Sequence, residues 1–104
     1  MDAKQRYEDL VDDLCAQHDN VTPSQMMGMP CVKRNGKMVA GFTRSSMVFK
    51  LPDPDTHARA LALDGAHLFD PSGEGRPFKE WVVVPAAHAD EWESLSNEAL
   101  KPAG

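Results

Sequence analysis

The segment MMGMPCVKRNGKMVAGF, residues 26–42, decides the fold of this chain. Its centre, Asn35-Gly36, is the strongest turn signal in the sequence, because both residues tolerate the positive φ that a two-residue type I′ hairpin turn requires. The side chains on either side follow the period of two that is typical of strands. The segment therefore predicts a β-hairpin in which the chain reverses at Asn35-Gly36.

The turn also predicts a register, because a two-residue turn fixes the pairs that follow it. The expected pairs are Arg34 with Lys37, Lys33 with Met38, Val32 with Val39, Cys31 with Ala40 and Met29 with Phe42. One face of the hairpin is then mainly apolar and is expected to meet the core: Met29, Cys31, Met38, Ala40 and Phe42, with Lys33 near the tip. The opposite face carries Val32, Val39, Arg34 and Lys37, and its two cations are expected to stay in water.

The residues outside the hairpin predict three helices and three further strands. Apolar residues recur at helical spacing over residues 3–18, and Thr22-Pro23 is expected to belong to the break after this helix. Asp53-Pro54 is expected to begin the second helix, as an N-cap followed by proline at the first helical position. The remaining expected elements are strands over residues 46–51, 67–70 and 79–85 and a last helix over residues 87–100.

These elements predict one domain that spans residues 1–104. A chain of 104 residues fits the common domain size, and 41% apolar and 26% charged residues are ordinary for a globular protein. The expected fold class is α+β, with two layers, the order α-β-β-β-α-β-β-α, and a mainly antiparallel sheet on which the helices pack.

Localisation is expected to be cytoplasmic. No apolar run approaches the roughly 20 residues that cross a bilayer, so no membrane association is predicted. The N-terminal residues MDAKQRYEDL are charged and contain no apolar signal core. Cys15 and Cys31 suit a reducing compartment, in which they are expected to be free thiols.

The net charge of −5 is unevenly distributed along the chain. Residues 1–19 carry −4 and residues 53–104 carry −6, whereas residues 20–52 contain five bases and no acid. The overall sign argues against direct nucleic-acid binding, but a local basic patch could still engage an anionic partner. The candidate partner-binding residues form a set that we call the basic hairpin: Lys33, Arg34, Lys37 and Arg44. Two structural explanations compete with partner binding: cations protect exposed strands from aggregation, and they can pair with acidic helices of the same molecule.

The sequence predicts no metal site and no cofactor. Met26, Met27 and Met29 could bind a soft metal together with Cys31. They lack repeated spacing and neighbouring histidines, so a role as flexible apolar filler is favoured. The four histidines are scattered, and neither HExxH nor paired CxxC occurs, which argues against zinc.

No catalytic residue is predicted either, and the protein is expected not to be an enzyme. Cys31 lies on the expected apolar face, where a buried thiol is inert. The GEGRP segment, residues 73–77, contains a lone GxG that is followed by proline and a strand, so a plain loop is expected rather than a phosphate-binding loop.

Several segments together resemble the TfoX/Sxy N-terminal domain family. The resemblance covers about residues 25–100: a Met-x-Gly start, the basic Asn-Gly hairpin, the Phe49-Lys50 pair that ends a strand, and the WVVVP strand before the last helix. The YjbR-like domains have a similar tryptophan- and valine-containing strand and stay open as an alternative. The resemblance implies a secretion-chaperone-like α+β fold and a link to the regulation of transcription in natural competence. Family members with that role carry a second, helical domain, and the family supplies no catalytic residues.

Two functions remain open from the sequence. The first is a non-enzymatic interaction module with a protein partner or a second copy of itself, since opposite charge blocks favour a salt-sensitive homodimer. The second is a small-ligand-binding protein or enzyme with a pocket near Cys31, residues 73–77 and Trp81. Direct contact of Arg34 and Lys37 with DNA is a weaker third reading.

Overall fold

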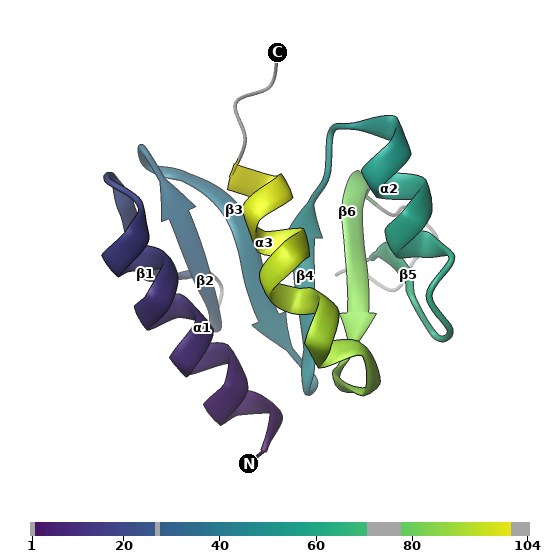
Figure 1. The fold of residues 1–104 in the computed structure, drawn as a ribbon, viewed down its shortest axis with the longest axis horizontal. Coiled ribbons are helices and arrows are strands. Elements are labelled where there is room, and N and C mark those ends of the chain that lie inside the picture. The colour runs from purple at the N-terminus through teal and green to yellow at the C-terminus, as the bar shows by residue number, and fades with distance from the viewer. Residues whose placement is uncertain (1, 27, 71–77, 101–104) are drawn as a thin grey trace.

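The structure is a computed structural model that describes residues 2–26, 28–70 and 78–100. These residues fold into one antiparallel sheet with helices across one face (Figure 1). The sheet order is β1-β2-β3-β4-β6-β5, and all neighbours are antiparallel. The strands are β1 (Val21–Met26), β2 (Met29–Arg34), β3 (Lys37–Thr43), β4 (Ser46–Lys50), β5 (His67–Phe69) and β6 (Phe78–Pro85). The helices are α1 (Ala3–Gln17), α2 (Pro54–Leu61), the 3-10 helix η1 (Ala86–Glu91) and α3 (Trp92–Leu100). The predicted α+β class and order are confirmed, with β1 as an additional strand at the sheet edge.

Strand β1 was not predicted, because Pro23 suggests a break rather than a strand. Asn35 N donates to Asn20 O over 3.0 Å, and β1 continues this register so that Pro23 stands opposite Val32. Along an antiparallel ladder, hydrogen-bonded pairs alternate with pairs that are not hydrogen-bonded. The backbone N–H and C=O groups of Thr22 and Ser24 therefore point toward β2, whereas the backbone N and C=O of Pro23 point toward the sheet edge. A proline there removes no ladder hydrogen bond, and it also hinders a further strand from adding to this edge.

The predicted reversal at Asn35-Gly36 is confirmed, with φ of 54° at Asn35 and 81° at Gly36. The first pairs also follow the prediction, since Arg34 pairs with Lys37 and Lys33 with Met38. Beyond them the register shifts by one residue. Val39 is the extra residue of a β-bulge, which places two residues of one strand against one of the other.

The bulge makes the predicted core face of the hairpin wrong in part. Val32 now pairs with Ala40 on the helix-covered face, and both are fully buried in the main core. Cys31 pairs with Gly41 on the opposite face, where Met29 and Met38 also lie. Because successive side chains point to opposite faces, a strand that sends Val32 to the helices cannot also send Cys31 there. The sulfur-bearing side chains therefore lie behind the sheet, and the prediction of inward orientation fails for them.

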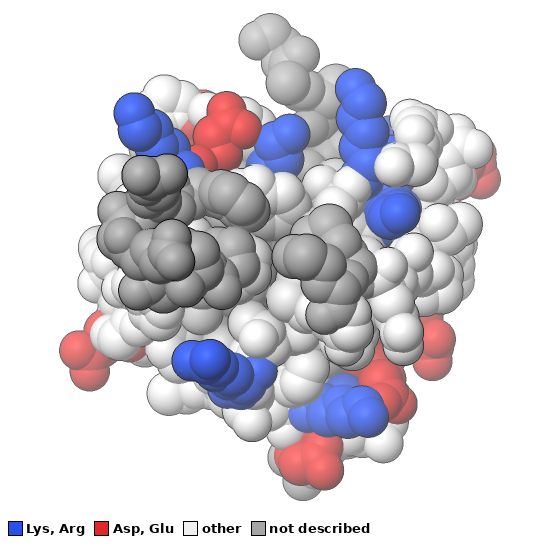
Figure 2. All heavy atoms as spheres, turned by 180° about the vertical axis from the view of Figure 1, so that it is seen from behind, with Lys and Arg blue, Asp and Glu red and all other residues white. Residues whose placement is uncertain are grey.

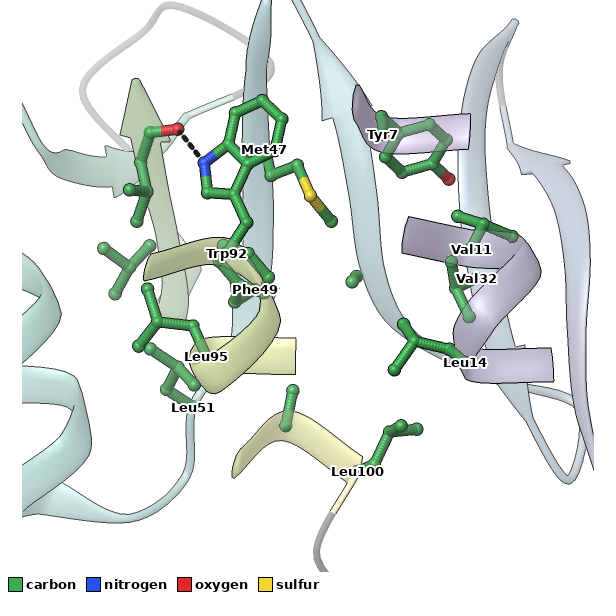
Figure 3. Close-up of a cluster of buried hydrophobic side chains, with 14 of the residues drawn as sticks. Tyr7, Val11, Leu14, Val32, Met47, Phe49, Leu51, Trp92, Leu95 and Leu100 are labelled. Carbon is green, nitrogen blue, oxygen red and sulfur yellow. Dashed lines mark hydrogen bonds between the residues drawn. The ribbon is translucent and has the colours of Figure 1, made fainter. Parts of the chain in front are cut away.

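The core lies between the sheet and helices α1 and α3. Figure 3 shows Tyr7 projecting from α1 and Trp92 from α3 toward the sheet between them. Phe42 of β3 joins the two helices, because its ring centroid is 5.2 Å from that of Tyr7 and 6.5 Å from that of Trp92. The Trp92 indole Nε1 donates to the carbonyl of Val84 over 3.3 Å. The aromatic contacts and this hydrogen bond hold α3 over the centre of the sheet.

The buried Tyr7 predicts a loss of stability in alkali. Burial raises the pKa of Tyr7 well above its ordinary value of 10.0, and charge on Cys31 or Cys15 would raise it further. Above about pH 10 the unfolded chain therefore releases this proton before the folded chain does, so unfolding becomes more favourable as pH rises. Urea unfolding between pH 8 and about pH 11 is expected to show this decline, and Tyr7→Phe is expected to decline less steeply. Equal slopes in the two proteins would contradict the assignment to Tyr7.

Candidate binding site

A hollow lies at the tip of the β2–β3 hairpin, and we call it the tip groove. Its volume is about 420 Å³. The hairpin contributes residues 34–35 and 37–39, the end of β4 contributes Lys50, β6 contributes Glu80, and α3 contributes its last two residues. The groove therefore brings together the ends of elements that are far apart in the sequence.

The lining of the tip groove carries a net positive charge. Three cations, Arg34, Lys37 and Lys50, face one carboxylate, Glu80. Figure 2 shows the sheet from behind, with several Lys and Arg side chains toward the top edge and others near the bottom, and with acidic side chains among them. Clustered cations around a hollow raise the local concentration of anions. Electrostatics at this end of the sheet therefore favour an anionic ligand.

Arg34 also has a structural role. Its guanidinium donates to the carbonyl of Leu100, the last residue of α3. The last carbonyls of a helix have no partner within the helix, and a cation near this end also interacts favourably with the helix dipole. Arg34 thus fixes the hairpin tip against α3. The side chain is half-buried rather than fully in water, which corrects the prediction for this residue.

The structure divides the predicted basic hairpin. Arg34 and Lys37 share the tip groove, as expected. Lys33 pairs with Met38 on the opposite face of the sheet. Arg44 lies in the turn after β3, at the far end of a seven-residue strand, which places it roughly 20 Å from the tip at about 3.3 Å per residue. Neither Lys33 nor Arg44 lines the groove, and the expectation that Arg44 lies within reach of the tip is wrong.

Lys50 is the groove cation that sequence analysis missed. It pairs with Trp81 at the end of β4, and β4 runs antiparallel to β3. The end of β4 therefore returns toward the level at which β3 begins, and the register brings Lys50 to the level of Val39, two residues from Lys37. Strand order and direction could have indicated this neighbour, because the third strand of a meander ends beside the first turn.

The alternative pocket near Cys31 gains no support from the described residues. Burial raises the pKa of the Cys31 thiol, and the nearby Lys33 charge and a hydrogen bond with Ser24 oppose this only in part. A buried, protonated thiol is a poor nucleophile. The tip groove includes neither Cys31 nor Trp81, and residues 73–77 lie outside the described residues.

Three histidines hold connecting segments through their rings. Nε2 of His57 donates to the carbonyl of Lys79 over 2.7 Å, and Nε2 of His88 donates to the carbonyl of Asp64 over 2.8 Å. Nδ1 of His67 lies 3.2 Å from the carbonyl of Gly65. A carbonyl only accepts, so each of these nitrogens carries a proton. Within residues 2–26, 28–70 and 78–100, no three His, Cys, Asp or Glu side chains are placed to hold a metal ion.

Comparisons with protein-family models, with curated proteins and with solved structures found no match to this chain. Among the described helices, none combines the length and apolar character needed to traverse a lipid bilayer.

Proposed function

We propose that the protein is a non-catalytic binding module that takes an acidic segment of a protein partner into the tip groove. The observation that carries this proposal is the convergence of Arg34, Lys37 and Lys50 from three different strands on one hollow that holds a single carboxylate. Complementary charge at such a surface favours specific encounter with an oppositely charged partner. We place this activity in the cytoplasm, in line with the reducing compartment that the free cysteines suggest.

The chemistry of the groove suits a short acidic peptide with apolar neighbours. Arg34 has five N–H donors, so its bond to the Leu100 carbonyl leaves others for a carboxylate. Lys37 and Lys50 add two flexible ammonium groups, and Met38, Val39 and Pro52 add apolar surface. Fixed guanidinium geometry with adaptable lysines is well suited to carboxylate recognition. The net charge of −5 opposes contact with a nucleic-acid duplex. A role in regulating transcription, which the resemblance implies, would therefore act through a protein.

A second copy of this chain is one possible partner. The outer face of α1 exposes four carboxylates, those of Glu8, Asp9, Asp12 and Asp13. A two-fold pair that sets each acidic helix against the other tip groove would satisfy both charge blocks at once. Self-association by this route would weaken with salt, because the exposed ion pairs that hold it are screened.

Fluorescence anisotropy with a fluorescein-labelled hexaglutamate peptide tests the proposed function. We expect saturable binding at about 20 mM salt and an affinity at least about tenfold lower at about 500 mM salt, because screening shortens the reach of the groove cations. Hexaglutamine and hexalysine peptides of the same length serve as controls and are expected not to bind. Absence of saturable binding of hexaglutamate at low salt would reject the tip groove as an anion-binding site.

Sedimentation velocity on the same samples separates the two kinds of partner. A dimer at low salt that dissociates at high salt, or on addition of hexaglutamate, would identify a second copy as the occupant. A monomer that binds hexaglutamate would identify a different protein as the partner.

A further inference from the structure

A cluster of sulfur-bearing side chains lies on the sheet face opposite the helices. Gly41 is at its centre. A Cβ built on Gly41 would lie 2.9 Å from Cε of Met29 and 2.9 Å from Cε of Met38. Both thioether side chains therefore end over the same point of the sheet, on the side toward which a Gly41 side chain would project.

Cys31 belongs to the same cluster because the bulge at Val39 sets it directly opposite Gly41. Side chains that stand opposite each other in an antiparallel pair share a face, and their Cβ positions lie about 4.5–5.5 Å apart. The Cys31 side chain and the methyl ends of Met29 and Met38 are therefore neighbours on this face of the sheet. In the register that the turn alone predicts, Cys31 would oppose Ala40 and the three groups would not meet over a glycine.

We propose that Met29, Cys31 and Met38 form a binding site for a soft monovalent metal ion, Cu(I) or Ag(I). Thioether and thiolate sulfurs are the ligands that Cu(I) prefers, and three of them suffice for a low-coordinate site. Binding replaces the thiol proton of Cys31 by the metal, which forms one Cu–S bond to the thiolate and releases one proton, with no change in oxidation state. This site lies outside the tip groove lining, apart from Met38 at its edge.

The exposure of the three ligands suits binding from solution. Cys31 is 1% exposed, so the thiolate is shielded from water and from competing oxygen ligands. Met29 and Met38 are partly exposed, and their flexible side chains can turn aside to admit an ion. Gly41 has no side chain, so the methyl ends of Met29 and Met38 occupy the space that a Cβ would fill.

Anaerobic competition with the coloured Cu(I) complex of bicinchoninate tests the proposal. The wild-type protein is expected to remove one equivalent of Cu(I). We expect Cys31→Ser to abolish this uptake, and Met29→Leu and Met38→Leu each to weaken it at least about tenfold, since each removes one soft ligand. Met47→Leu and Cys15→Ser are matched controls that remove the same kinds of sulfur elsewhere. Met47 lies in the helix-side core, and both controls are expected to retain wild-type affinity.

Methyl NMR provides a readout that does not depend on substitution. In protein labelled with ¹³C at the methionine methyl groups, addition of one equivalent of Ag(I) is expected to shift the Met29 and Met38 signals and to leave the Met47 signal in place. The proposal is overturned if the wild type removes no Cu(I) from the chelator, if the three ligand variants match the controls, or if Ag(I) leaves the Met29 and Met38 signals unchanged.

Discussion

Replacing Trp92 with alanine is expected to lower the free energy of unfolding by about 3–5 kcal/mol. Trp92 is 1% exposed, packs edge-on against Phe42 and donates from its indole to the Val84 carbonyl. The substitution leaves a large cavity between α3 and the sheet and removes the partner of a buried carbonyl. Against a total stability of about 5–15 kcal/mol for such a domain, this loss is severe.

Urea unfolding followed by far-ultraviolet circular dichroism measures this loss. Glu91→Ala is the matched control. Glu91 precedes Trp92 in the chain, and its side chain is exposed. Its removal should change the free energy of unfolding by no more than about 0.5 kcal/mol. Trp92→Phe keeps an aromatic ring beside Phe42 but loses the hydrogen bond, so an intermediate loss is expected even if the alanine variant does not fold. A Trp92→Ala loss below about 1 kcal/mol would contradict the central place of Trp92 in the core.

The second large effect is expected on binding rather than on stability. Lys37→Glu combined with Lys50→Glu should lower the affinity for hexaglutamate by at least about tenfold, because two attractive charges at the groove become repulsive. Arg34 is left unchanged, since its bond to the Leu100 carbonyl also supports α3. The anisotropy assay at low salt provides the measurement.

The control for this variant carries the same change of net charge at other places. Lys33→Glu combined with Arg44→Glu alters residues that lie outside the groove lining, and we expect it to lower the affinity clearly less than the groove variant does, because neither side chain contacts the bound peptide and only longer-range repulsion remains. An equal loss in both double variants would show that overall charge, and not the tip groove, governs binding.

The local signals in the sequence predicted the elements well because they act over a few residues. Asn35-Gly36 forms the expected turn. Asp53 caps α2 as expected, with its Oδ2 accepting from the backbone N–H of Thr56 over 3.0 Å. Such turns and caps depend on short-range geometry that the residues themselves impose. Their presence indicates where strands and helices begin, but not how they pack.

Which face of the hairpin packs against the core could not be predicted in the same way. The alternation places Met38, Ala40 and Phe42 on one face, and no local pattern indicates the bulge that separates Met38 from the other two. The bulge at Val39 then changes the pairing beyond Lys33. The face of the hairpin that enters the core is determined by α1 and α3, which pack over Val32, Ala40 and Phe42. These helices lie far from the hairpin residues in the sequence. A shift of one residue reverses every side chain beyond it.

The candidate site was predictable only where neighbours in sequence are neighbours in space. Arg34 and Lys37 flank the turn, and the structure places both in the tip groove. Arg44 could have been excluded from strand length, because seven residues of β3 separate it from the tip. Lys50 and the C-terminal end of α3 enter through the return of β4 and the packing of α3, which no local pattern encodes.

An NMR titration of the ¹⁵N-labelled protein with hexaglutamate tests the proposed function most directly. The account predicts that the amide signals of Arg34, Lys37, Lys50 and Leu100 shift together with one dissociation constant, and that the signal of Arg44 stays in place. Shifts confined to Lys33 or Arg44, or a spectrum that does not change, would contradict the claim that this protein binds acidic partners in the tip groove.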